Sequence, residues 1–301
     1  LVGMTVVAGL ASIAARLGVL HWIGDIFALF IDTYFWLSLA GLIGFVLLRN
    51  WRWSTIAGLI FALNASSLIG YLPVNQRVDA SSQRDVRLFV YNMYYANDDL
   101  DGVLEEIARH DPDVVFLMEY SYAIQREIES RFADYPYRVI EPSQITMGLA
   151  LFSRIPLGEA QVHRFVETRI PIYQVEMEIA DQTVTFVGGH PWPPIGRWGQ
   201  LHRAQMADIT DIAAQSTAPL IVAGDFNASQ WSYAVQDLAQ AARVADAQRG
   251  FGFQKTWFLS PVFGLPLDHV LVSGEWTVLD YSQGEAGGSD HVPLIVDLRL
   301  E

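Results

Sequence analysis

The first 72 residues form three long apolar segments, whereas the rest of the chain alternates short apolar runs with polar stretches. The segments are Leu1 to Leu20, which contains Arg16, then Ile26 to Leu48, and Thr55 to Leu72. Each is close to the length of about 20 residues that a helix needs to cross a bilayer. A cleaved signal peptide would explain one such segment but not three in succession. The pattern therefore predicts about three transmembrane helices over residues 1–72, with the buried helical core of a soluble protein as the alternative.

The connectors between these segments predict an orientation in the membrane. The connector Arg49 to Trp53 carries two arginines and two tryptophans, whereas the connector His21 to Asp25 has no lysine or arginine. Basic connectors favour the cytoplasmic side, and tryptophans favour the membrane interface. With three crossings, the region after Pro73 lies on the outer face. We therefore expect a multi-pass protein of the inner membrane whose catalytic domain is periplasmic or extracellular. The chain begins with Leu1 rather than Met, so an additional upstream segment is an open alternative.

Residues 73–84 are rich in polar residues and are predicted to be a linker, so that a single domain extends over residues 85–301. Apolar runs with strand character predict strands at 86–91, 114–118, 148–152, 174–179, 183–187, 220–223, 270–272 and 292–298. Amphipathic spacing predicts helices at 99–109, 198–214 and 231–242. Strands outnumber helices, which favours an α/β fold of two packed sheets flanked by helices over a simple alternating parallel fold.

The predicted domain is strongly acidic. Residues 81–301 carry 15 of the 19 basic and 30 of the 33 acidic residues, a net charge near −15, and Lys255 is the only lysine of the chain. A negative surface repels the phosphate backbone of nucleic acids. Duplex nucleic acid is therefore an unlikely partner. Cysteine is absent, which excludes disulfides and thiolate metal sites.

Polar residues follow or precede the predicted strands at regular points of the domain. The acidic, amide and imidazole side chains at strand ends are Asn92, Glu119, His190, Asp225, Asn227, Asp268, Asp290 and His291. Such groups at one edge of a sheet are what metal-assisted attack on a phosphate ester requires. The sequence therefore predicts a hydrolytic site at the strand ends.

Residue type predicts a role for each group. A hard divalent cation prefers one or two carboxylates together with water and substrate phosphate, so Glu119 is the first candidate ligand and Asp290 the second. The amides of Asn92 and Asn227 can donate to phosphate oxygens or bind a metal through the carbonyl. His291 can exchange protons near neutral pH, and a buried carboxylate such as Asp268 would fix its tautomer.

Asp225 is expected to take the proton of the attacking water or to bind metal. Other hydrolytic motifs are missing from the sequence: there is no Gly-x-Ser-x-Gly elbow, no phosphate-binding Gly-rich loop ending in Lys-Ser or Lys-Thr, and no His-Glu-x-x-His helix. Ser289 is therefore interpreted as a turn residue. His269 is expected to point away from Asp268 because neighbouring residues of a strand face opposite sides. Arg203 and Gln205 are placed on the solvent or packing face of their helix.

Seven short motifs together resemble the endonuclease/exonuclease/phosphatase superfamily over about residues 85–300. They are Val90-Tyr91-Asn92, Phe116-Leu117-Met118-Glu119, Leu151-Phe152-Ser153-Arg154, Gly189-His190, Gly224-Asp225-Phe226-Asn227, Leu267-Asp268-His269-Val270 and Ser289-Asp290-His291. The resemblance implies a four-layer α/β sandwich of two mixed sheets and a Mg²⁺-dependent phosphoesterase site, with Mn²⁺ as a possible substitute.

By position, the resemblance implies that Glu119 is the principal magnesium ligand with Asn92 nearby, and that His190 and Asn227 contact the scissile phosphate. His291, oriented by Asp268, and Asp225 would be the acid–base residues around the attacking water, and which of the two activates the water stays open.

Two departures from the family pattern stand out. Met118 occupies a position where the family commonly has glutamine. His190 is followed by the stiff loop Pro191-Trp192-Pro193-Pro194. This loop, with Trp198, Trp231 and Trp257, is expected either to line a substrate groove, to lie against lipid or to pack loops onto the core.

The leading functional hypothesis is a membrane-anchored, metal-dependent phosphoesterase with a lipid-linked or envelope substrate, because a tethered enzyme meets lipid at the membrane surface. An envelope nuclease is the first alternative. A non-catalytic binding domain displayed on the membrane is the second, although such a domain has no need of the whole set of polar residues.

Overall fold

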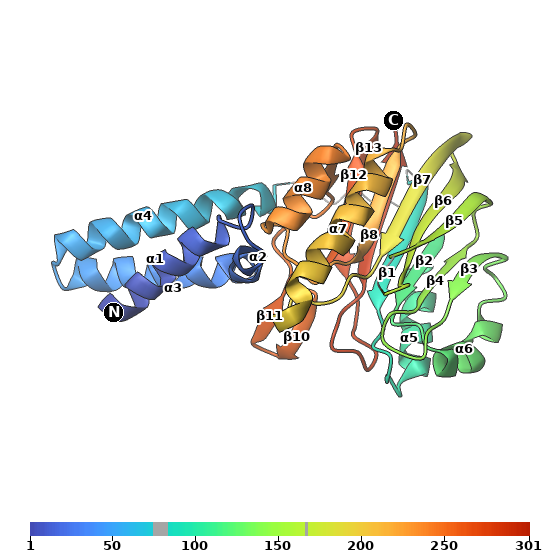
Figure 1. The fold of residues 1–301 in the computed structure, drawn as a ribbon, viewed down its shortest axis with the longest axis horizontal. Coiled ribbons are helices and arrows are strands. Elements are labelled where there is room, and N and C mark those ends of the chain that lie inside the picture. The colour runs from blue at the N-terminus through green and yellow to red at the C-terminus, as the bar shows by residue number, and fades with distance from the viewer. Residues whose placement is uncertain (75–83, 166–167) are drawn as a thin grey trace.

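The computed structural model describes residues 1–74, 84–165 and 168–301. A helical bundle projects from one side of a domain built of two β-sheets (Figure 1). The helices are α1 (Val2–Ala15), α2 (Ile23–Ala28), α3 (Ile31–Leu47), α4 (Trp51–Leu68), α5 (Leu100–His110), α6 (Tyr122–Ile128), α7 (Gly199–Ala214) and α8 (Tyr233–Ala241).

The strands of the domain are β1 (Val86–Asn92), β2 (Val114–Met118), β3 (Tyr137–Glu141), β4 (Leu149–Ser153), β5 (Leu157–Arg164), β6 (Pro171–Ile179), β7 (Gln182–Gly189), β8 (Leu220–Asp225), β9 (Val244–Asp246), β10 (Trp257–Ser260), β11 (Phe263–Leu265), β12 (Asp268–Ser273), β13 (Trp276–Gln283) and β14 (Leu294–Leu300). The first sheet has the order β13-β14-β1-β2-β4-β3 and the second the order β5-β6-β7-β8-β12-β9, while β10 and β11 form a separate hairpin. β1 and β2 are parallel, as are β7 and β8, and the other strand pairs are antiparallel. The predicted pair of mixed sheets flanked by helices is confirmed.

The two sheets pack face to face and each is covered by helices on its outer side (Figure 1). In β1, Leu88 and Val90 point into the core between the sheets, whereas Phe89 and Tyr91 pack against α5 and its neighbours. Alternate residues of a strand face opposite sides. Because both sides are buried, the strand reads as a continuous apolar run. The interior positions of β1 and β2 from Leu88 to Tyr91 and from Val114 to Leu117 are therefore apolar, and Asn92 and Glu119 come directly after these runs or one residue later.

Most predicted elements lie within one to three residues of the observed ones. Several elements were missed: α6, β3, β5, β9, the β10–β11 hairpin and β13. β5 shows the reason, because it is an edge strand in which Glu159 and Gln161 are exposed. Exposed polar positions remove the apolar pattern from which a strand is predicted.

The N-terminal module differs from the prediction in its helix boundaries. The segment Leu1 to Leu20 is helical only as far as Ala15, and the predicted helix Ile26 to Leu48 is divided into α2 and α3. The division arises because α2 packs on the two-sheet domain rather than continuing along the bundle. Within the described residues, one helix, Trp51–Tyr71, is long and apolar enough to cross a membrane, and Val2–Ala15 and Ile31–Leu47 are shorter apolar helices. The three predicted crossings stay a prediction. Of the predicted linker 73–84, residues 75–83 lie outside the described residues.

The helical module is docked on the two-sheet domain through specific contacts. Trp231 packs edge-on against Tyr71, and its indole nitrogen donates to the carbonyl oxygen of Ser67 at 3.0 Å. Lys255 forms an ion pair of 2.7 Å with Asp32 of α3. The helices therefore lie against the side of the domain formed by α7, α8 and the β10–β11 hairpin (Figure 1).

Candidate active site

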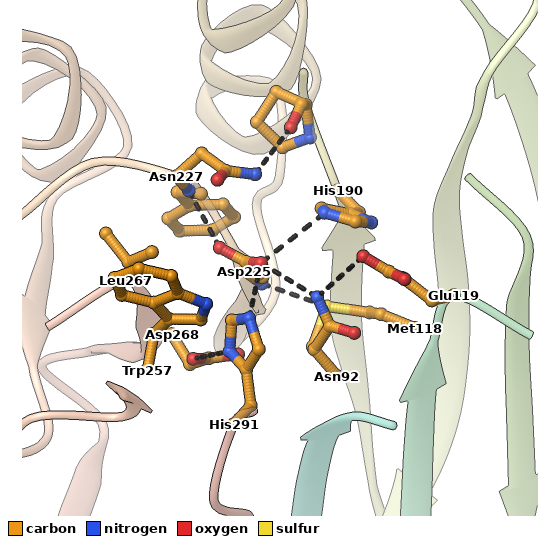
Figure 2. Close-up of polar contacts among 12 residues, drawn as sticks. Asn92, Met118, Glu119, His190, Asp225, Asn227, Trp257, Leu267, Asp268 and His291 are labelled. Carbon is orange, nitrogen blue, oxygen red and sulfur yellow. Dashed lines mark hydrogen bonds and ion pairs between the residues drawn. The ribbon is translucent and has the colours of Figure 1, made fainter. Parts of the chain in front are cut away.

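The predicted site residues are brought together at one edge of the two sheets. Asn92 ends β1, Glu119 follows β2, His190 follows β7 and Asp225 ends β8. β12 and β14 run antiparallel to β8 and β1, so Asp268 at the start of β12 and His291 before β14 reach the same edge. Figure 2 shows these side chains pointing toward one another from both sheets.

Asp225 lies at the centre of this cluster and is buried. Its Oδ2 atom accepts a hydrogen bond from Asn92 Nδ2 at 2.9 Å and lies 3.4 Å from His190 Nε2 and 3.6 Å from His291 Nε2. Its Oδ1 atom accepts the backbone N–H of Asn227 at 2.9 Å. Burial alone would raise the pKa of Asp225, but the charges of His291 and His190 hold it below the usual range. Asp225 is therefore ionised at neutral pH.

His291 is held between two carboxylates. Its Nδ1 atom lies 2.7 Å from Asp268 Oδ2, and its Nε2 atom faces Asp225. Burial alone would lower the pKa of His291, but Asp268 and Asp225 raise it to about 10. Ser289 lies in the preceding turn, where its hydroxyl donates to the Asn92 carbonyl oxygen and accepts the backbone N–H of His291. It thus acts as a turn residue, as predicted, and ties His291 to the end of β1.

Glu119 has a backbone φ of +59°, in the left-handed region that a non-glycine residue rarely adopts. Its Oε2 atom accepts the backbone N–H of Tyr95 at 2.9 Å, and Oε1 lies 3.3 Å from Asn92 Nδ2. Burial raises the pKa of Glu119, and His190 opposes that shift. Backbone strain of this kind occurs at functional sites. Here it turns the carboxylate toward the cluster.

The buried imidazole of His190 has a raised pKa: burial alone would lower it, but the hydrogen bond and charge of Asp225 and the charge of Glu119 raise it. Its Nδ1 atom has no hydrogen-bond partner within the described part of the chain. Asn227, at a φ of +48°, donates from Nδ2 to the carbonyl oxygen of Pro191 at 3.1 Å. An amide nitrogen carries two hydrogens, so Asn227 retains one donor for a ligand.

Asp290 lies on the side of the cluster formed by the β10–β11 hairpin. Its Oδ2 atom accepts a hydrogen bond of 2.7 Å from the indole nitrogen of Trp257. Both residues line the same cavity as Glu119 and His291. Asp290 is therefore available at the site, with one oxygen already engaged by Trp257.

Several residues outside the predicted set position the cluster. The sulfur of Met118 accepts the backbone N–H of Asp225 at 2.9 Å, so this residue joins the two sheets at the position where glutamine is expected. Gln205 is buried, and its Oε1 atom accepts the backbone N–H of Trp192 at 2.8 Å. Gln205 therefore lies on the packing face of its helix, as expected, and it also fixes the loop that follows His190.

The tryptophans divide into two groups. Trp192 and Trp257 line the cavity, and Trp198 stacks on Trp192 with ring centroids 5.4 Å apart. Trp231 packs the helical module onto the domain instead. His269 points away from the cluster, as predicted, and lies 2.7 Å from the carbonyl oxygen of Ala228. Arg203 also lies outside the site and pairs with Asp25 of α2.

The cluster opens into a cavity of about 470 Å³. Glu119, Asp225 and Asp290 contribute three carboxylates to its wall, and none of the described residues that line it is an arginine or lysine. A bound phosphate would therefore face negative charge without a permanent side-chain cation. Sequence reasoning missed Ile26 and Leu29, which also line the cavity, because they belong to the apolar N-terminal segments.

A divalent cation fits this donor set. The carboxylate of Glu119 and the side-chain amide oxygen of Asn92 supply hard oxygen donors, with Asp290 as a further carboxylate. Asp225, Asp268 and His291 also have potential ligand atoms within 4.8 Å of one another. Both ring nitrogens of His291 face carboxylates, so the imidazole has no free lone pair for a metal. Glu119 is therefore the better-suited ligand.

A family model described as the Endonuclease/Exonuclease/phosphatase family matches residues 89–291. UPF0294 proteins of Vibrio cholerae are 38% identical over 107 residues, which cover 34% of this chain and 35% of the relative. A UPF0294 protein of Yersinia pestis is 36% identical over 103 residues, 33% of this chain and 36% of the relative. The matched region thus spans about a third of the length of these relatives.

Solved structures share the fold. A humanized D. rerio TDP2 superposes with a TM-score of 0.60 at 17% identity, covering 71% of this chain and 98% of that one. The human nocturnin catalytic domain with bound sulfate gives 0.57 at 19% identity, with 72% and 94% coverage. An endonuclease/exonuclease/phosphatase from Beutenbergia cavernae gives 0.56 at 17% identity, with 72% coverage of each chain.

The family match includes the strand ends from β1 to His291, where the polar residues converge. The predicted enzyme class, a metal-dependent phosphoric ester hydrolase, is confirmed at the level of the family. This chain belongs to the endonuclease/exonuclease/phosphatase family.

Proposed function

We propose that this protein is a Mg²⁺-dependent phosphoesterase anchored in a membrane by its N-terminal helices, with a lipid-linked or other envelope phosphate ester as substrate. The observation that carries the proposal is the composition of the cavity. The cavity is lined by Ile26 and Leu29 of the helical module as well as by Glu119, His190, Asp225 and His291. The groups suited to phosphoryl chemistry and an apolar surface that could contact a lipid chain thus lie in one cavity.

The protonation states suit an in-line attack by water on phosphorus. Asp225 is ionised and lies where it can accept the proton of the attacking water. His291 is protonated and can donate a hydrogen bond or a proton to a phosphate oxygen, while Asp268 holds its orientation. His190 and Asn227 would hold the remaining phosphate oxygens. A divalent cation at Glu119 and Asn92 would supply positive charge for the phosphate.

Magnesium is favoured by the chemistry of the donors. The candidate ligands are carboxylate and amide oxygens, and the chain has no cysteine. Mg²⁺ is bound by one or two carboxylates together with water and substrate phosphate. Mn²⁺ accepts similar oxygen ligands and would be expected to replace it.

The surface of the helical bundle supports membrane anchoring. Large apolar side chains are exposed along its helices, including Leu47 in α3 at 77% and Leu59 in α4 at 67%. Many exposed apolar side chains on one module are unfavourable in water and typical of contact with lipid. The basic connector around Arg49 and Arg52 favours a cytoplasmic position, which would leave the catalytic domain on the periplasmic or extracellular side.

An envelope nuclease is less well supported. Nucleic-acid sites use lysine and arginine to neutralise backbone phosphates, whereas the described lining of this cavity has neither. The TDP2 of D. rerio has been solved with a single-strand DNA product, and that property belongs to TDP2. A single-stranded substrate is therefore included in the test.

The test uses the full chain purified into lipid nanodiscs. We expect Mg²⁺-dependent hydrolysis of a chromogenic phosphodiester or phosphomonoester, loss of turnover with chelator, and preference for lipid phosphate esters over single-stranded and duplex DNA. If no substrate were hydrolysed either with or without Mg²⁺, the proposal that the protein is a hydrolase would be wrong. A preference for DNA would replace the proposed substrate class by nucleic acid.

Anchoring and orientation are tested separately in cells. We expect the chain to remain in the membrane fraction after a carbonate wash, and a C-terminal alkaline phosphatase fusion to be active outside the cytoplasm. Release of the chain by carbonate would contradict membrane anchoring. An inactive alkaline phosphatase fusion together with a fluorescent C-terminal green fluorescent protein fusion would show that the domain lies in the cytoplasm.

A further inference from the structure

The helical module contributes a wall to the cavity that contains the catalytic groups. Ile26 of α2 and Leu29, which directly follows this helix, line it together with Pro193 and Ile195 of the loop after His190. Leu265 of the β10–β11 hairpin lines it as well. The cavity therefore combines the polar cluster with a lining that is otherwise largely apolar.

Helix α2 is fixed in this position from both ends. Near its start, the buried carboxylate of Asp25 accepts the backbone N–H of Tyr233 at 2.6 Å and pairs with Arg203 at 3.0 Å. At its end, the hydroxyl of Ser229 donates to the carbonyl oxygen of Ala28 at 2.9 Å. Ser229 lies two residues after Asn227. The wall formed by α2 is thus tied directly to a loop of the catalytic cluster.

The loop after His190 and the β10–β11 hairpin, which both contribute residues to the cavity lining, also carry exposed apolar side chains. Ile195 is 69% exposed, and Leu259 and Val262 at the tip of the β10–β11 hairpin are 71% and 93% exposed. Phe263 of the hairpin contacts Phe30, which follows α2, with ring centroids 6.3 Å apart. The hairpin therefore lies on the side of the domain that carries the helical bundle (Figure 1). On a membrane-anchored protein this side faces the lipid.

We infer that Ile26, Leu29 and the Trp192–Ile195 loop form an apolar subsite. The subsite binds the aliphatic chain of a membrane lipid phosphate ester while the phosphate reaches the catalytic cluster. This inference rests on the proposed function. An aliphatic chain is uncharged and gains by leaving water. It therefore tolerates the carboxylates and the lack of lysine and arginine in the described lining, which a polynucleotide does not. Helix α2 acts as a specificity element as well as part of the anchor.

The subsite makes chain length a measurable property of the reaction. Burial of one methylene group corresponds to about a fourfold gain in binding or in kcat/KM. A series of p-nitrophenyl alkyl phosphodiesters with methyl, butyl and hexyl groups keeps the reacting bond constant. Water attacks phosphorus, the bond to p-nitrophenolate breaks, and the alkyl phosphate and a proton are released. Any difference in kcat/KM along the series therefore reports on the chain.

The experiment compares the full chain in nanodiscs with three variants. For the wild type we expect kcat/KM to rise about a hundredfold or more from the methyl to the hexyl ester. In the double variant Ile26→Ala/Leu29→Ala the hexyl-to-methyl ratio should fall at least tenfold. Ile26→Trp fills the subsite and should lower the hexyl-to-methyl ratio as well. This variant replaces the double variant in the test if the double variant does not fold. Ile23→Ala/Phe27→Ala changes exposed residues of the same helix outside the cavity lining and should keep the wild-type ratio.

The outcomes separate this inference from the proposed function. A wild type that hydrolyses all esters equally with Mg²⁺ is a phosphoesterase without the subsite. A wild-type ratio retained in both Ile26 variants places the chain elsewhere and overturns the role of α2. Absence of Mg²⁺-dependent turnover for every ester overturns the proposed function itself.

Discussion

The Oδ2 atom of Asp268 lies 2.7 Å from Nδ1 of His291, and both side chains are buried. Together with Asp225, this carboxylate outweighs the effect of burial and raises the pKa of His291 to about 10. Asp268→Asn removes one of the two charges. We expect the pKa of His291 to fall toward the ordinary histidine value of about 6.5. Imidazole ¹⁵N signals recorded during a pH titration of the metal-free protein would measure the shift.

The sign of the effect also predicts a pH dependence of stability. A pKa raised in the folded state adds stability that is fully present below about pH 6.5 and is lost as the pH rises through about 10. Asp268→Asn should therefore destabilise the metal-free protein at pH 7 more than at pH 10. Asp101→Asn, which changes an exposed carboxylate, is the control. An unaltered His291 titration in Asp268→Asn would show that this pair does not set the charge of the ring.

Glu119→Gln keeps the shape of the side chain but removes the charge of the first candidate metal ligand. We expect kcat/KM to fall about a hundredfold or more, because even the partners of metal ligands typically contribute ten- to a hundredfold. The Mg²⁺ concentration for half-maximal activity should rise as well. A Mg²⁺ titration of initial rates measures both quantities.

Glu105→Gln is the matched control, since Glu105 is an exposed glutamate of α5. Circular dichroism of both variants would verify that they fold. If Glu119→Gln retained the wild-type rate and the wild-type Mg²⁺ response, Glu119 would have no place in the metal site.

Gly224 allows the ends of β7 and β8 to approach closely. A Cβ atom at this position would lie 2.0 Å from the carbonyl oxygen of Gly189. Gly224→Ala therefore has to separate the two strand ends that carry His190 and Asp225. We expect a destabilisation of about 1–3 kcal/mol and a loss of activity of about a hundredfold from the misplaced groups.

The control for this change is Gly274→Ala, because a Cβ atom at Gly274 meets no atom within 4 Å. Thermal unfolding and kcat/KM would be measured for both variants. Equal activity of Gly224→Ala and Gly274→Ala would mean that the contact between the strand ends is not needed for catalysis.

The convergence of the polar cluster could be predicted because its residues lie at the ends of buried strands. Leu88 to Tyr91 in β1 and the whole of β2 are apolar runs, so the sequence locates Asn92 and Glu119 at the strand ends. Residues whose partners are distant in sequence were not predictable in this way. Gln205 looks like an ordinary helical residue until Trp192 is placed against it.

The break between α2 and α3 has the same origin. Asp32 is the only charged residue from Ile26 to Leu48, so the pattern predicts a single apolar helix. One contact that holds α2 against the domain is made by Asp25, whose partner Arg203 is 178 residues away. The contribution of Ile26 and Leu29 to the cavity follows from that contact and was therefore missed as well.

The ion pair between Asp25 and Arg203 is expected to control how firmly the helical module is docked. Asp25 is buried, and Arg203 also donates to the carbonyl oxygen of Gly18. Removing one partner of a buried pair costs about 3–5 kcal/mol, and since Arg203 is a quarter exposed we expect about 2–3 kcal/mol for Asp25→Asn. The melting temperature in detergent should fall accordingly, while Asp101→Asn, whose pair with Arg131 is exposed, should leave it unchanged.

The absence of cysteine in the chain permits a direct measurement of docking. Spin labels on Ile23→Cys in α2 and Gln240→Cys in α8, both exposed positions, would report the distance between the module and the domain. A single narrow distance distribution is expected when Asp25 is present. Asp25→Asn should broaden it, because α2 loses the contact that orders it against α7 and α8. A distribution that stays narrow would mean that the apolar contacts around Trp231 hold the module without this pair, and the cavity wall formed by α2 would then survive the loss of Asp25.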